Sequence, residues 1–471
     1  MQKIIPAVLF LLLATQTSLA QYQYIDEVLE YTPAPGQHIN TSPWGMPESA
    51  ESIVGTITGS LTLGAWGGYV VFRFENPVNN HPDNPFGIDF IIFGNPSATW
   101  AEPASVWVMK DENGNGLPDG TWYQLAGSDY FFSSTYHNYQ VTYFNPQTEN
   151  AADIPWEDSE GNEGVILANS FHTHNYYPNH DYFPHIPHEQ YTLSGSRIQG
   201  ATDKSNPAFI TSFPRAFGYA DNTPRKTAPF NVPDNPYTPE IENAGGDGFD
   251  ISWAVDEEGN YVELDEVHFI KVQTAMLDDG GWLGEVSAEI TGAVVVEPNS
   301  SITGILDRVV VKDLPLIIDQ TPYPLEAFAF HKGRWQNERT ILWSSNLEGA
   351  YVEDNSLHFN VSGELTLTAY LEDNPDIFTT VTTMLEYQPT HVSHLGKEDF
   401  KVFPNPASGF IHIETTGQTF VRLFDFQGKS LKEFSHPGGL HTLSLDNLKP
   451  GIYVITFTGI QGTSHQKIIV R

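Results

Sequence analysis

Cysteine is absent from the 471-residue chain, and this absence excludes disulfide bonds, thiolate metal sites and cysteine nucleophiles. Positive charge is scarce, because 22 Lys and Arg stand against 58 Asp and Glu and leave a formal net charge of -36. Such a field disfavours binding to nucleic acid or to an anionic membrane through overall charge, and it favours hard cations such as calcium. We therefore expect no nucleic-acid partner.

Long apolar runs and sustained helical periodicity are missing as well. No stretch after the N-terminus approaches the about 20 apolar residues of a membrane helix, so the sequence predicts no transmembrane segment. The G-x-S-x-G elbow, the P-loop and the dinucleotide fingerprint are also absent. The sequence therefore favours a protein without enzymatic activity and identifies no catalytic residue.

The first 20 residues, MQKIIPAVLFLLLATQTSLA, have the pattern of a secretory signal peptide. Lys3 supplies the positive start, an apolar run follows over residues 4–14, and small residues end the segment at Ala20. Since no cysteine follows the cleavage point, a lipid anchor is not expected. The mature protein is expected to begin near Gln21 as an exported, soluble chain.

The rest of the chain predicts β-structure almost throughout. Short runs rich in Val, Ile, Phe, Tyr and Trp, such as YVVFRF, DFIIFG, SVWVM and VHFIKVQTA, are separated by clusters of Gly, Pro, Asn and Asp. Many short strands between dense turn signals indicate β-sandwiches rather than alternating α/β units. We therefore predict an all-β chain.

Composition divides the mature chain into three modules. Residues 21–297 hold most of the Trp, His and Asn-Gly signals and are predicted to form a jelly-roll-like, ligand-binding β-sandwich. Residues 298–388 show plain strand alternation and resemble bacterial immunoglobulin-like repeats, and a linker is predicted at 389–398. Residues 397–471 hold 8 Lys or Arg against 6 Asp or Glu, and this change in charge balance marks a separate C-terminal module at 399–471.

The C-terminal module carries specific motifs. It opens with KVFPNPASGFIHIE, continues with the hairpin VRLFDFQGKSLKEF turning near Gly428, and has a Pro450-Gly451 turn before a strand in LDNLKPGIYVITFTG. This combination resembles the C-terminal sorting domain of the type IX secretion system. The resemblance implies a small β-sandwich, recognition by the type IX secretion machinery, transport across a Gram-negative outer membrane, and removal of the domain. It also implies that the remaining protein is released or attached at the outer cell surface.

A loop in SVWVMKDENGNGLPDGTWYQL has the spacing of a calcium site. Oxygen ligands alternate along it, a glycine at the sixth position permits a sharp bend, and a backbone carbonyl falls at the seventh. The predicted calcium ligands are Asp111, Asn113, Asn115, the carbonyl oxygen of Leu117, and Asp119. Few of them are charged, which suits the affinity of extracellular modules, about 10⁻⁴–10⁻³ M. The expected role of calcium is structural, and the alternative is a hairpin decorated with Asn-Gly turns.

Five histidines lie in FHTHNYYPNHDYFPHIPHEQY, residues 171–191. His172 and His174 would face the same side of a strand, and with a third imidazole they would suit zinc or copper. Prolines make the remainder irregular, so three interpretations stay open: a metal site, a platform for a sugar or macrocycle, and an ordinary surface loop. The ligand-binding candidates of this stretch are His172, His174, Tyr176, Tyr177 and Tyr182.

Carboxylates near the end of the first module suggest a further candidate site. Glu285 and Glu289 in GWLGEVSAEI share one face if this run is a strand, and Trp282 stands close to them in the sequence. Glycosidases use such carboxylate pairs, although a solvated strand face explains the pattern equally well. Trp282 is kept as a ligand-binding candidate, and a glycan-active hydrolase is the third functional hypothesis.

Residues 26–292 also resemble a family of secreted surface proteins from bacteria with type IX secretion. The resemblance is carried by segments such as GGYVVFRFENPV, NSFHTHNYYP and FGYADNTP, and some family members stand beside outer-membrane uptake systems, including those for corrinoids. The strands GDGFDISWAVD and VHFIKVQTA are similar to discoidin-like jelly rolls, whose end loops bind sugars. The leading hypothesis is a secreted, calcium-stabilised, surface-displayed protein that binds carbohydrate. The alternative is capture of a corrinoid or another nutrient for an uptake system.

Overall fold

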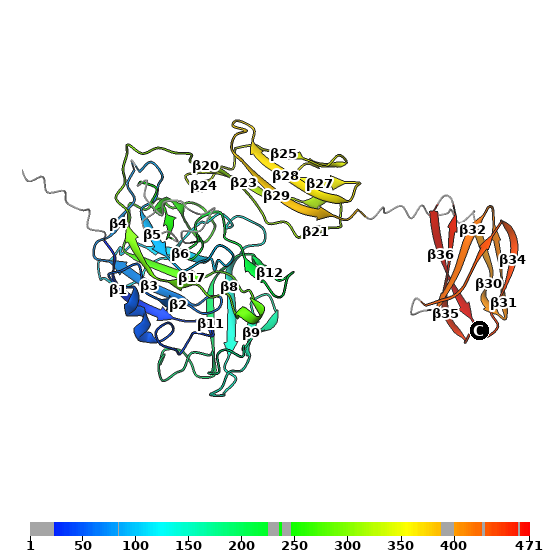
Figure 1. Ribbon diagram of the computed structural model, residues 1–471, viewed down its shortest axis with the longest axis horizontal. Coiled ribbons are helices and arrows are strands. Elements are labelled where there is room, and N and C mark those ends of the chain that lie inside the picture. Colours follow the sequence, from blue (N-terminus) through cyan, green and yellow to red (C-terminus); the bar gives the residue numbers. More distant parts are fainter. Residues whose placement is uncertain are drawn as a thin grey trace, which may run out of the picture. The chain divides into compact units, whose positions relative to one another are not determined.

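The computed structural model describes residues 23–82, 84–224, 235–237, 246–387, 400–425, 429–459 and 462–471. The predicted signal peptide, the linker at 389–398 and the turn at Gly428 lie outside these residues. The helices of the described chain are three short 3-10 segments, η1 (Pro47–Ile53), η2 (Ile251–Trp253) and η3 (Gly281–Leu283). The rest of its regular structure is β, so the all-β prediction is confirmed (Figure 1). None of these helices has the length and hydropathy needed to traverse a bilayer.

The chain forms two compact units. Among the described residues, unit 1 holds those up to 314 together with 325–344 and 367–381. Unit 2 holds 315–324, 345–366 and the remainder from 382 onward. The segment expected to be an immunoglobulin-like domain contributes residues to both units, and the predicted domain boundaries remain predictions.

The main sheet of unit 1 has six strands in the order β1-β3-β17-β6-β7-β15. These strands are β1 (Ile25–Thr32), β3 (Tyr69–Phe74), β17 (Phe269–Thr274), β6 (Ala104–Met109), β7 (Tyr123–Leu125) and β15 (Ala254–Val255). All pairs are antiparallel. Ile270 in β17 lies opposite Phe72 in β3 and Val108 in β6. The sheet therefore joins segments from the beginning and the end of residues 21–297.

Two smaller sheets complete the sandwich. One has the order β10-β9-β8-β11, and the other has the order β14-β5-β19. Their strands are β8 (Tyr136–Phe144), β9 (Ile154–Asp158), β10 (Glu163–Ile166), β11 (Gln190–Arg197), β5 (Phe90–Phe93), β14 (Gly246–Phe249) and β19 (Gly292–Val295). β8 and β11 alternate between exposed and buried residues, as expected for a sheet with one solvated face. β5, with the sequence FIIF, is buried on both faces.

Three two-stranded ladders accompany these sheets. They are β2 (Leu61–Thr62) with β18 (Glu289–Ile290), β4 (Val78–Asn79) with β16 (Glu266–Val267), and β12 (Thr202–Asp203) with β13 (Thr211–Ser212). Two of them, β2–β18 and β12–β13, adjoin residues of the candidate site. The β2–β18 ladder places Glu289 opposite Thr62.

Large aromatic rings dominate the core of unit 1, and one buried cluster contains side chains from both the six-stranded and the four-stranded sheets. The fully buried Trp66 ring packs edge-on against Tyr139, with 5.0 Å between ring centroids. Its Nε1 donates to the Ser196 carbonyl at 3.2 Å, and the Tyr143 hydroxyl donates to the Trp66 carbonyl at 2.8 Å. The rings thus bury their apolar area while their polar atoms stay hydrogen-bonded.

Unit 1 continues beyond residue 297 with the sheet β20-β23-β24, formed by β20 (Asp307–Val311), β23 (Ala327–His331) and β24 (Arg334–Trp335). Phe131 packs against Trp335 with 4.8 Å between ring centroids. The buried Arg215 guanidinium lies 3.3 Å from Asp129 and also binds Asp313. The aromatic contact and the ion pair between Arg215 and the half-exposed Asp313 therefore join this segment to the preceding residues of the unit.

The remaining strands include the predicted sorting domain. Outside that domain they are β21 (Ile317–Ile318), β22 (Tyr323–Pro324), β25 (Ile341–Ser345), β26 (Ala350–Glu353), β27 (Ser356–Phe359), β28 (Gly363–Leu371) and β29 (Phe378–Leu385). The sorting domain has β30 (Phe400–Ser408), β31 (Phe410–Thr415), β32 (Thr419–Asp425), β33 (Ser430–His436), β34 (Gly439–Ser444), β35 (Gly451–Gly459) and β36 (Gly462–Val470). β30 pairs with β31 and, through Ala407, with β36. It therefore joins two sheets of a small β-sandwich, as predicted.

A buried acidic pair near η2 generates a prediction about pH. Burial and the neighbouring Asp250 charge raise the pKa of Asp89 from 3.8 to about 8. Below that pH the folded state holds a proton that the unfolded state has lost, so stability falls as pH rises toward 8. We expect the free energy of unfolding to fall between about pH 6.5 and 8, by up to about 1.4 kcal/mol per pH unit for each such group.

Asp89→Asn imitates the protonated carboxyl and should reduce the fall in the free energy of unfolding between about pH 6.5 and 8. The control Asp26→Asn, at an exposed position, should leave that fall unchanged. Chemical denaturation in chelator at several pH values measures both. An Asp89→Asn protein with the same pH slope as wild type would contradict the prediction.

Candidate functional site

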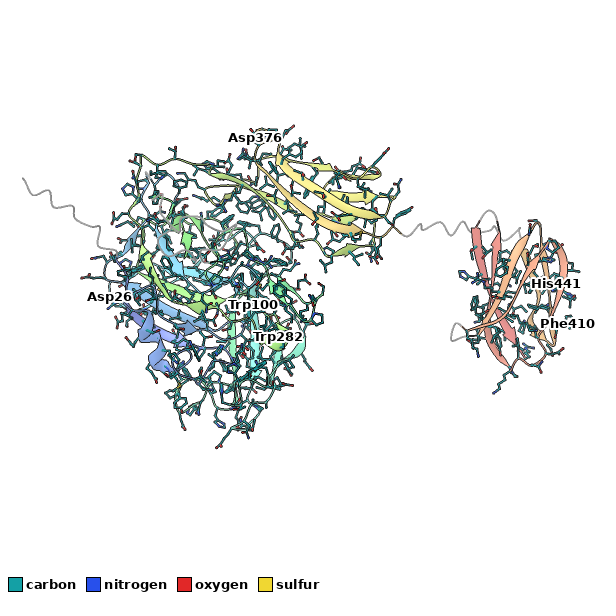
Figure 2. All side chains as sticks on the ribbon, viewed as in Figure 1. Asp26, Trp100, Trp282, Asp376, Phe410 and His441 are labelled. Carbon is teal, nitrogen blue, oxygen red and sulfur yellow. The ribbon has the colours of Figure 1, made fainter. Side chains whose placement is uncertain are left out.

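A cleft of about 540 Å³ lies among the loops of unit 1. Four aromatic side chains line it: Trp44, Trp100, Phe209 and Trp282. Trp44, Phe209 and Trp282 are 41%, 59% and 51% exposed. Figure 2 labels Trp100 and Trp282 on unit 1. The cleft therefore offers accessible aromatic surface for a ligand.

Glycines position the two labelled tryptophans. A Cβ at Gly280 would lie 2.5 Å from the Trp100 ring, so only glycine allows the ring to pack this closely. Gly281 begins η3 with a φ of +63°, a conformation that favours glycine. The Trp282 Nε1 donates to the Pro207 carbonyl at 3.1 Å. Trp282 is thereby fixed at the cleft while about half of its side chain stays exposed.

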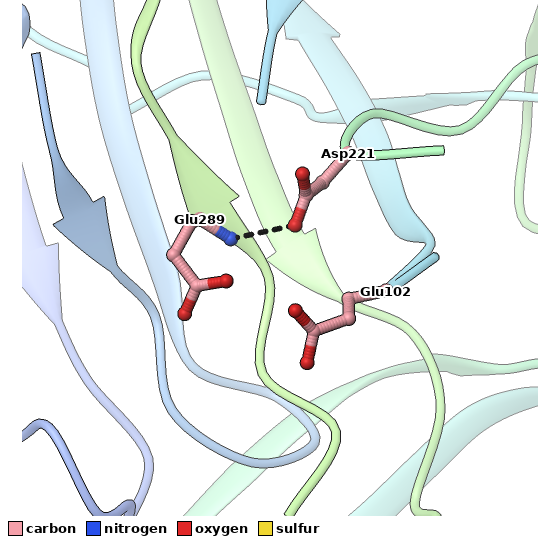
Figure 3. Close-up of side chains that lie close together, drawn as sticks. All are labelled: Glu102, Asp221 and Glu289. Carbon is pink, nitrogen blue, oxygen red and sulfur yellow. Dashed lines mark hydrogen bonds between the residues drawn. The ribbon is translucent and has the colours of Figure 1, made fainter. Parts of the chain in front are cut away.

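Three carboxylates from distant segments lie close together (Figure 3), and two of them, Glu102 and Glu289, line the cleft. Glu102 precedes β6, Asp221 follows Ala220, which bridges to Ala104 at the start of β6, and Glu289 begins β18. One ligand oxygen from each lies within 4.8 Å of the others. Within the described residues, these three carboxylates form the one group of at least three acidic or histidine side chains that lie close enough to share a metal ion.

Hydrogen bonds hold these carboxylates in place. Asp221 accepts from the backbone amides of Asn95 at 2.7 Å and Glu289 at 2.8 Å, the second of which is drawn in Figure 3. Glu102 Oε1 accepts from the Ser287 amide at 2.9 Å. Glu289 and Thr62 are joined through Oε1 and Oγ1 at 3.0 Å. The surrounding groups thus act as donors to the carboxylates. Glu102 and Glu289 also share a side-chain hydrogen bond, in which one of the two carboxyls holds the proton.

The electrostatics of the three acids favour either bound protons or a bound cation. Burial raises the pKa of Glu102, and burial with the charges of Glu102 and Asp221 raises that of Glu289 well above its ordinary range. Burial and the Glu102 charge also raise the pKa of Asp221. No salt bridge within the described residues involves any of the three. Their negative charge is therefore not neutralised by Lys or Arg.

A fourth acid, Glu285, lines the same cleft. Its side chain is 5% exposed, its Oε1 accepts from the Gln37 amide at 2.8 Å, and its Oε2 has no hydrogen-bond partner. Burial raises its pKa to about 8. The interpretation of Glu285 and Glu289 as a solvated strand face is therefore wrong, because Glu285 is buried and β18 is only Glu289–Ile290.

The predicted histidines lie in two different environments. His172 packs against His38, which lines the cleft, with 4.8 Å between ring centroids. Burial, followed by the charges of His172 and His174, lowers the pKa of His38 to about 4. His174 instead hydrogen-bonds the Ile39 carbonyl at 2.9 Å, and its ring centroid is 6.3 Å from that of His172. Within the described chain neither histidine belongs to a cluster close enough to share a metal ion, so the metal interpretation gains no support.

The predicted aromatic platform is wrong for Tyr176 and Tyr177. Both rings belong to the hydrophobic core, with exposures of 0% and 2%, because they fill the interior beneath the irregular loop. The Tyr177 hydroxyl donates to the Pro187 carbonyl at 2.7 Å. Tyr182 is 45% exposed and, with His174, lines a second, polar cleft of about 450 Å³. Of the aromatic candidates, Trp282 and Tyr182 are the accessible ones.

The predicted calcium loop is compact, and its proposed ligands lie together. Asp111 accepts from the backbone amides of Gly114 and Gly116, each at 2.8 Å, and both glycines have positive φ. The side-chain amides of Asn113 and Asn115 donate to the two oxygens of Asp119 at 3.2 and 2.9 Å.

Two further features of the loop bear on its role. The Leu117 carbonyl accepts from the Asp119 amide at 2.9 Å. Backbone hydrogen bonds lower the pKa of Asp111, so this carboxylate is ionised at neutral pH. The loop geometry is compatible with calcium, which remains a prediction.

Sequence reasoning missed most residues of the cleft. Glu102 lies in TWAEP and Asp221 in GYADN, and neither segment has the spacing of a known motif. Trp44 and Trp100 are isolated tryptophans without a periodic neighbour. The one available signal was the GWLGEVSAEI segment, which supplies Trp282, Glu285 and Glu289.

Comparison with known families identifies the C-terminal module. Residues 401–471 match the secretion system C-terminal sorting domain. The chain therefore carries a type IX sorting domain, which directs it to secretion and to the cell surface. The match covers only this module. The resemblance of residues 26–292 to surface proteins beside corrinoid uptake systems is not supported by any match, and no curated protein matches the chain.

Several solved structures with extracellular β-domains are weakly similar to the chain. Drosophila OTK extracellular domains 3-5 share 11% identity, cover 83% of this chain and 98% of their own, and give a TM-score of 0.18. The structure of Sidekick-1 immunoglobulin domains 1-5 shares 9% identity, covers 86% of this chain and 85% of its own, and gives a TM-score of 0.16. Dimeric latent PorU from Porphyromonas gingivalis shares 12% identity, covers 80% of this chain and 32% of its own, and gives a TM-score of 0.13. Superpositions this poor carry no argument about fold or function.

Proposed function

We propose that this secreted surface protein binds carbohydrate in the cleft of unit 1 and has no catalytic role. The observation that carries the proposal is the pairing of exposed tryptophans with buried acidic side chains in one cavity of about 540 Å³. Sugar rings present an apolar face and a rim of hydroxyls. Aromatic rings stack on the first, and carboxylates accept hydrogen bonds from the second.

The dimensions and the chemistry of the cleft support a small saccharide or the end of a longer glycan. Its volume falls within the range of about 300–1,000 Å³ that is usual for small-molecule sites. Trp282 and Phe209 are half exposed, so a chain extending out of the cavity would still meet aromatic surface. His38 lines the same cavity, and its imidazole is a further polar group beside the aromatic rings.

Trp282→Ala tests this function directly. Trp282 is 51% exposed, so its removal should leave the fold stable. It should weaken glycan binding about tenfold, which corresponds to about 1.4 kcal/mol. A glycan array followed by titration calorimetry on the best glycan provides the measurement. Phe378→Ala, which removes a ring that is 58% exposed outside the cleft, is the matched control and should bind as wild type.

Equal binding by Trp282→Ala and wild type would sink the assignment of the cleft. The same assay separates the other two hypotheses. Binding of cobalamin with no glycan bound would favour nutrient capture. Release of shortened glycan during incubation would show a hydrolase instead of a binding protein.

Export through the sorting domain gives a second test. Deleting residues 401–471 should leave the protein inside the outer membrane of its host, because the secretion machinery recognises this domain. Cell fractionation and protease treatment of intact cells measure the distribution. Restoring the domain to the truncated protein should restore surface exposure. Normal surface amounts of the truncated protein would contradict the proposed route.

We further propose that the loop 111–119 binds calcium in a structural role. Asp119→Ala is the sharper variant, since Asp111 also holds backbone amides that its removal would leave unpaired. The variant should melt at a lower temperature than wild type in millimolar calcium and at the same temperature in chelator. A tenfold excess of calcium over its dissociation constant stabilises by about 1.4 kcal/mol.

Glu112→Ala, at an exposed position of the same loop, is the control and should melt as wild type in both solutions. If Asp119→Ala loses no more calcium-dependent stability than Glu112→Ala, the loop is only a hairpin.

A further inference from the structure

The acidic triad Glu102, Asp221 and Glu289 has a geometry that one cation can satisfy. Calcium binds oxygen at about 2.3–2.6 Å, so two oxygens on one ion are separated by at most about twice that distance. The triad oxygens lie within 4.8 Å of one another. A single ion can therefore contact all three carboxylates without rearrangement of the backbone.

The donors around the triad are those expected around ligating carboxylates. Asp221 is held by two backbone amides and Glu102 by one, which leaves other lone pairs of these oxygens for an ion. Such outer hydrogen bonds orient carboxylate ligands in metal sites.

A second observation points to a ligand in the same cleft. Glu285 is 5% exposed, lines the cleft together with Glu102 and Glu289, and has an Oε2 without a hydrogen-bond partner. A buried polar atom left unpaired costs about 1–3 kcal/mol. The lining of the cleft contains no Lys or Arg. A cation held by the triad would neutralise its charge, and a hydroxyl of a ligand in the cleft would give Glu285 Oε2 a hydrogen-bond partner.

We propose that Glu102, Asp221 and Glu289 bind a divalent cation, with calcium as the best match, and that the ion meets the ligand of the cleft. Glu102 and Glu289 line the cavity, so part of the coordination sphere faces it. Calcium takes about 6–8 oxygens, and the three carboxylates leave positions for vicinal hydroxyls of a sugar. The cation site stands on the geometry alone, and only its contact with sugar depends on the proposed function. It is distinct from the loop 111–119.

The test must separate this site from that loop. The background is the full chain carrying Asp111→Asn and Asp119→Asn, which disables the loop. Calcium titration by calorimetry, and terbium luminescence excited through tryptophan, measure what remains. Trp100 lies within hydrogen-bonding reach of Glu102, so terbium at the triad should be strongly sensitised. We expect one ion per chain in this background.

Adding Glu289→Gln or Glu102→Gln should raise the calcium dissociation constant at least about tenfold and remove the terbium signal. Asp26→Asn, an exposed change of the same kind, should alter neither. Melting curves in chelator verify folding. If Glu102→Gln fails to fold, Glu289→Gln decides, because Glu289 is only partly buried. No calcium or terbium binding in the loop-disabled chain, or equal affinity after Glu289→Gln, would overturn the proposal.

Glycan binding in calcium and in chelator tests the second half. We expect the best array glycan to bind at least about tenfold more weakly in chelator and to Glu289→Gln. Equal binding in both solutions would refute contact between ion and sugar while leaving the proposed function intact. Calcium bound at the triad with no glycan recognised would retain the cation site and remove the proposed function.

Discussion

Buried carboxylates that accept backbone hydrogen bonds are the interaction on which the N-terminal part of the structure depends. Its strands are joined by long irregular loops, whose buried amides must find acceptors outside the sheets. Four carboxylates accept hydrogen bonds from backbone amides in this way. Asp221 accepts from Asn95 and Glu289, and Asp247 accepts from Asn222 and Thr223. Glu102 accepts from Ser287, and Glu285 accepts from Gln37. Each of these bonds ties together segments far apart in the sequence. The acids thus organise the loops that surround the cleft.

This use of acidic side chains has a cost that shapes the site. A carboxylate bound by amides is well placed as an acceptor, but burial without a positive partner disfavours its charge. For Asp129 and Asp313, the Arg215 guanidinium is such a positive partner. No equivalent cation from the described residues reaches Glu102 or Glu289, so protons or a metal ion must take that role. The requirement to neutralise charge and the capacity to bind a ligand therefore arise from the same arrangement.

The sequence predicts the parts of this protein that rest on local patterns. Strand composition gave the all-β fold, and the Pro450-Gly451 turn with its flanking strands gave the sorting domain, because each is contained in a short segment. The cleft could not be predicted, since Glu102, Asp221 and Glu289 come together only through the tertiary fold. Tyr176 and Tyr177 were misassigned because a loop rich in aromatics has the same composition whether its rings face solvent or fill a core. Trp282 was found because three functional side chains fall within one short segment.

The cleft and the sorting domain consist of separate residues. Every residue lining the cleft lies between Gln37 and Glu289, whereas the matched sorting domain begins at 401. The sorting domain also has its own apolar core, in which Ile411, Val421 and Ile455 are fully buried. A defect in one activity therefore need not disturb the other, because no side chain is shared between them. It follows that substitutions in the cleft leave the sorting domain unchanged, so a chain with altered cleft residues can test the proposed binding without changing the export signal.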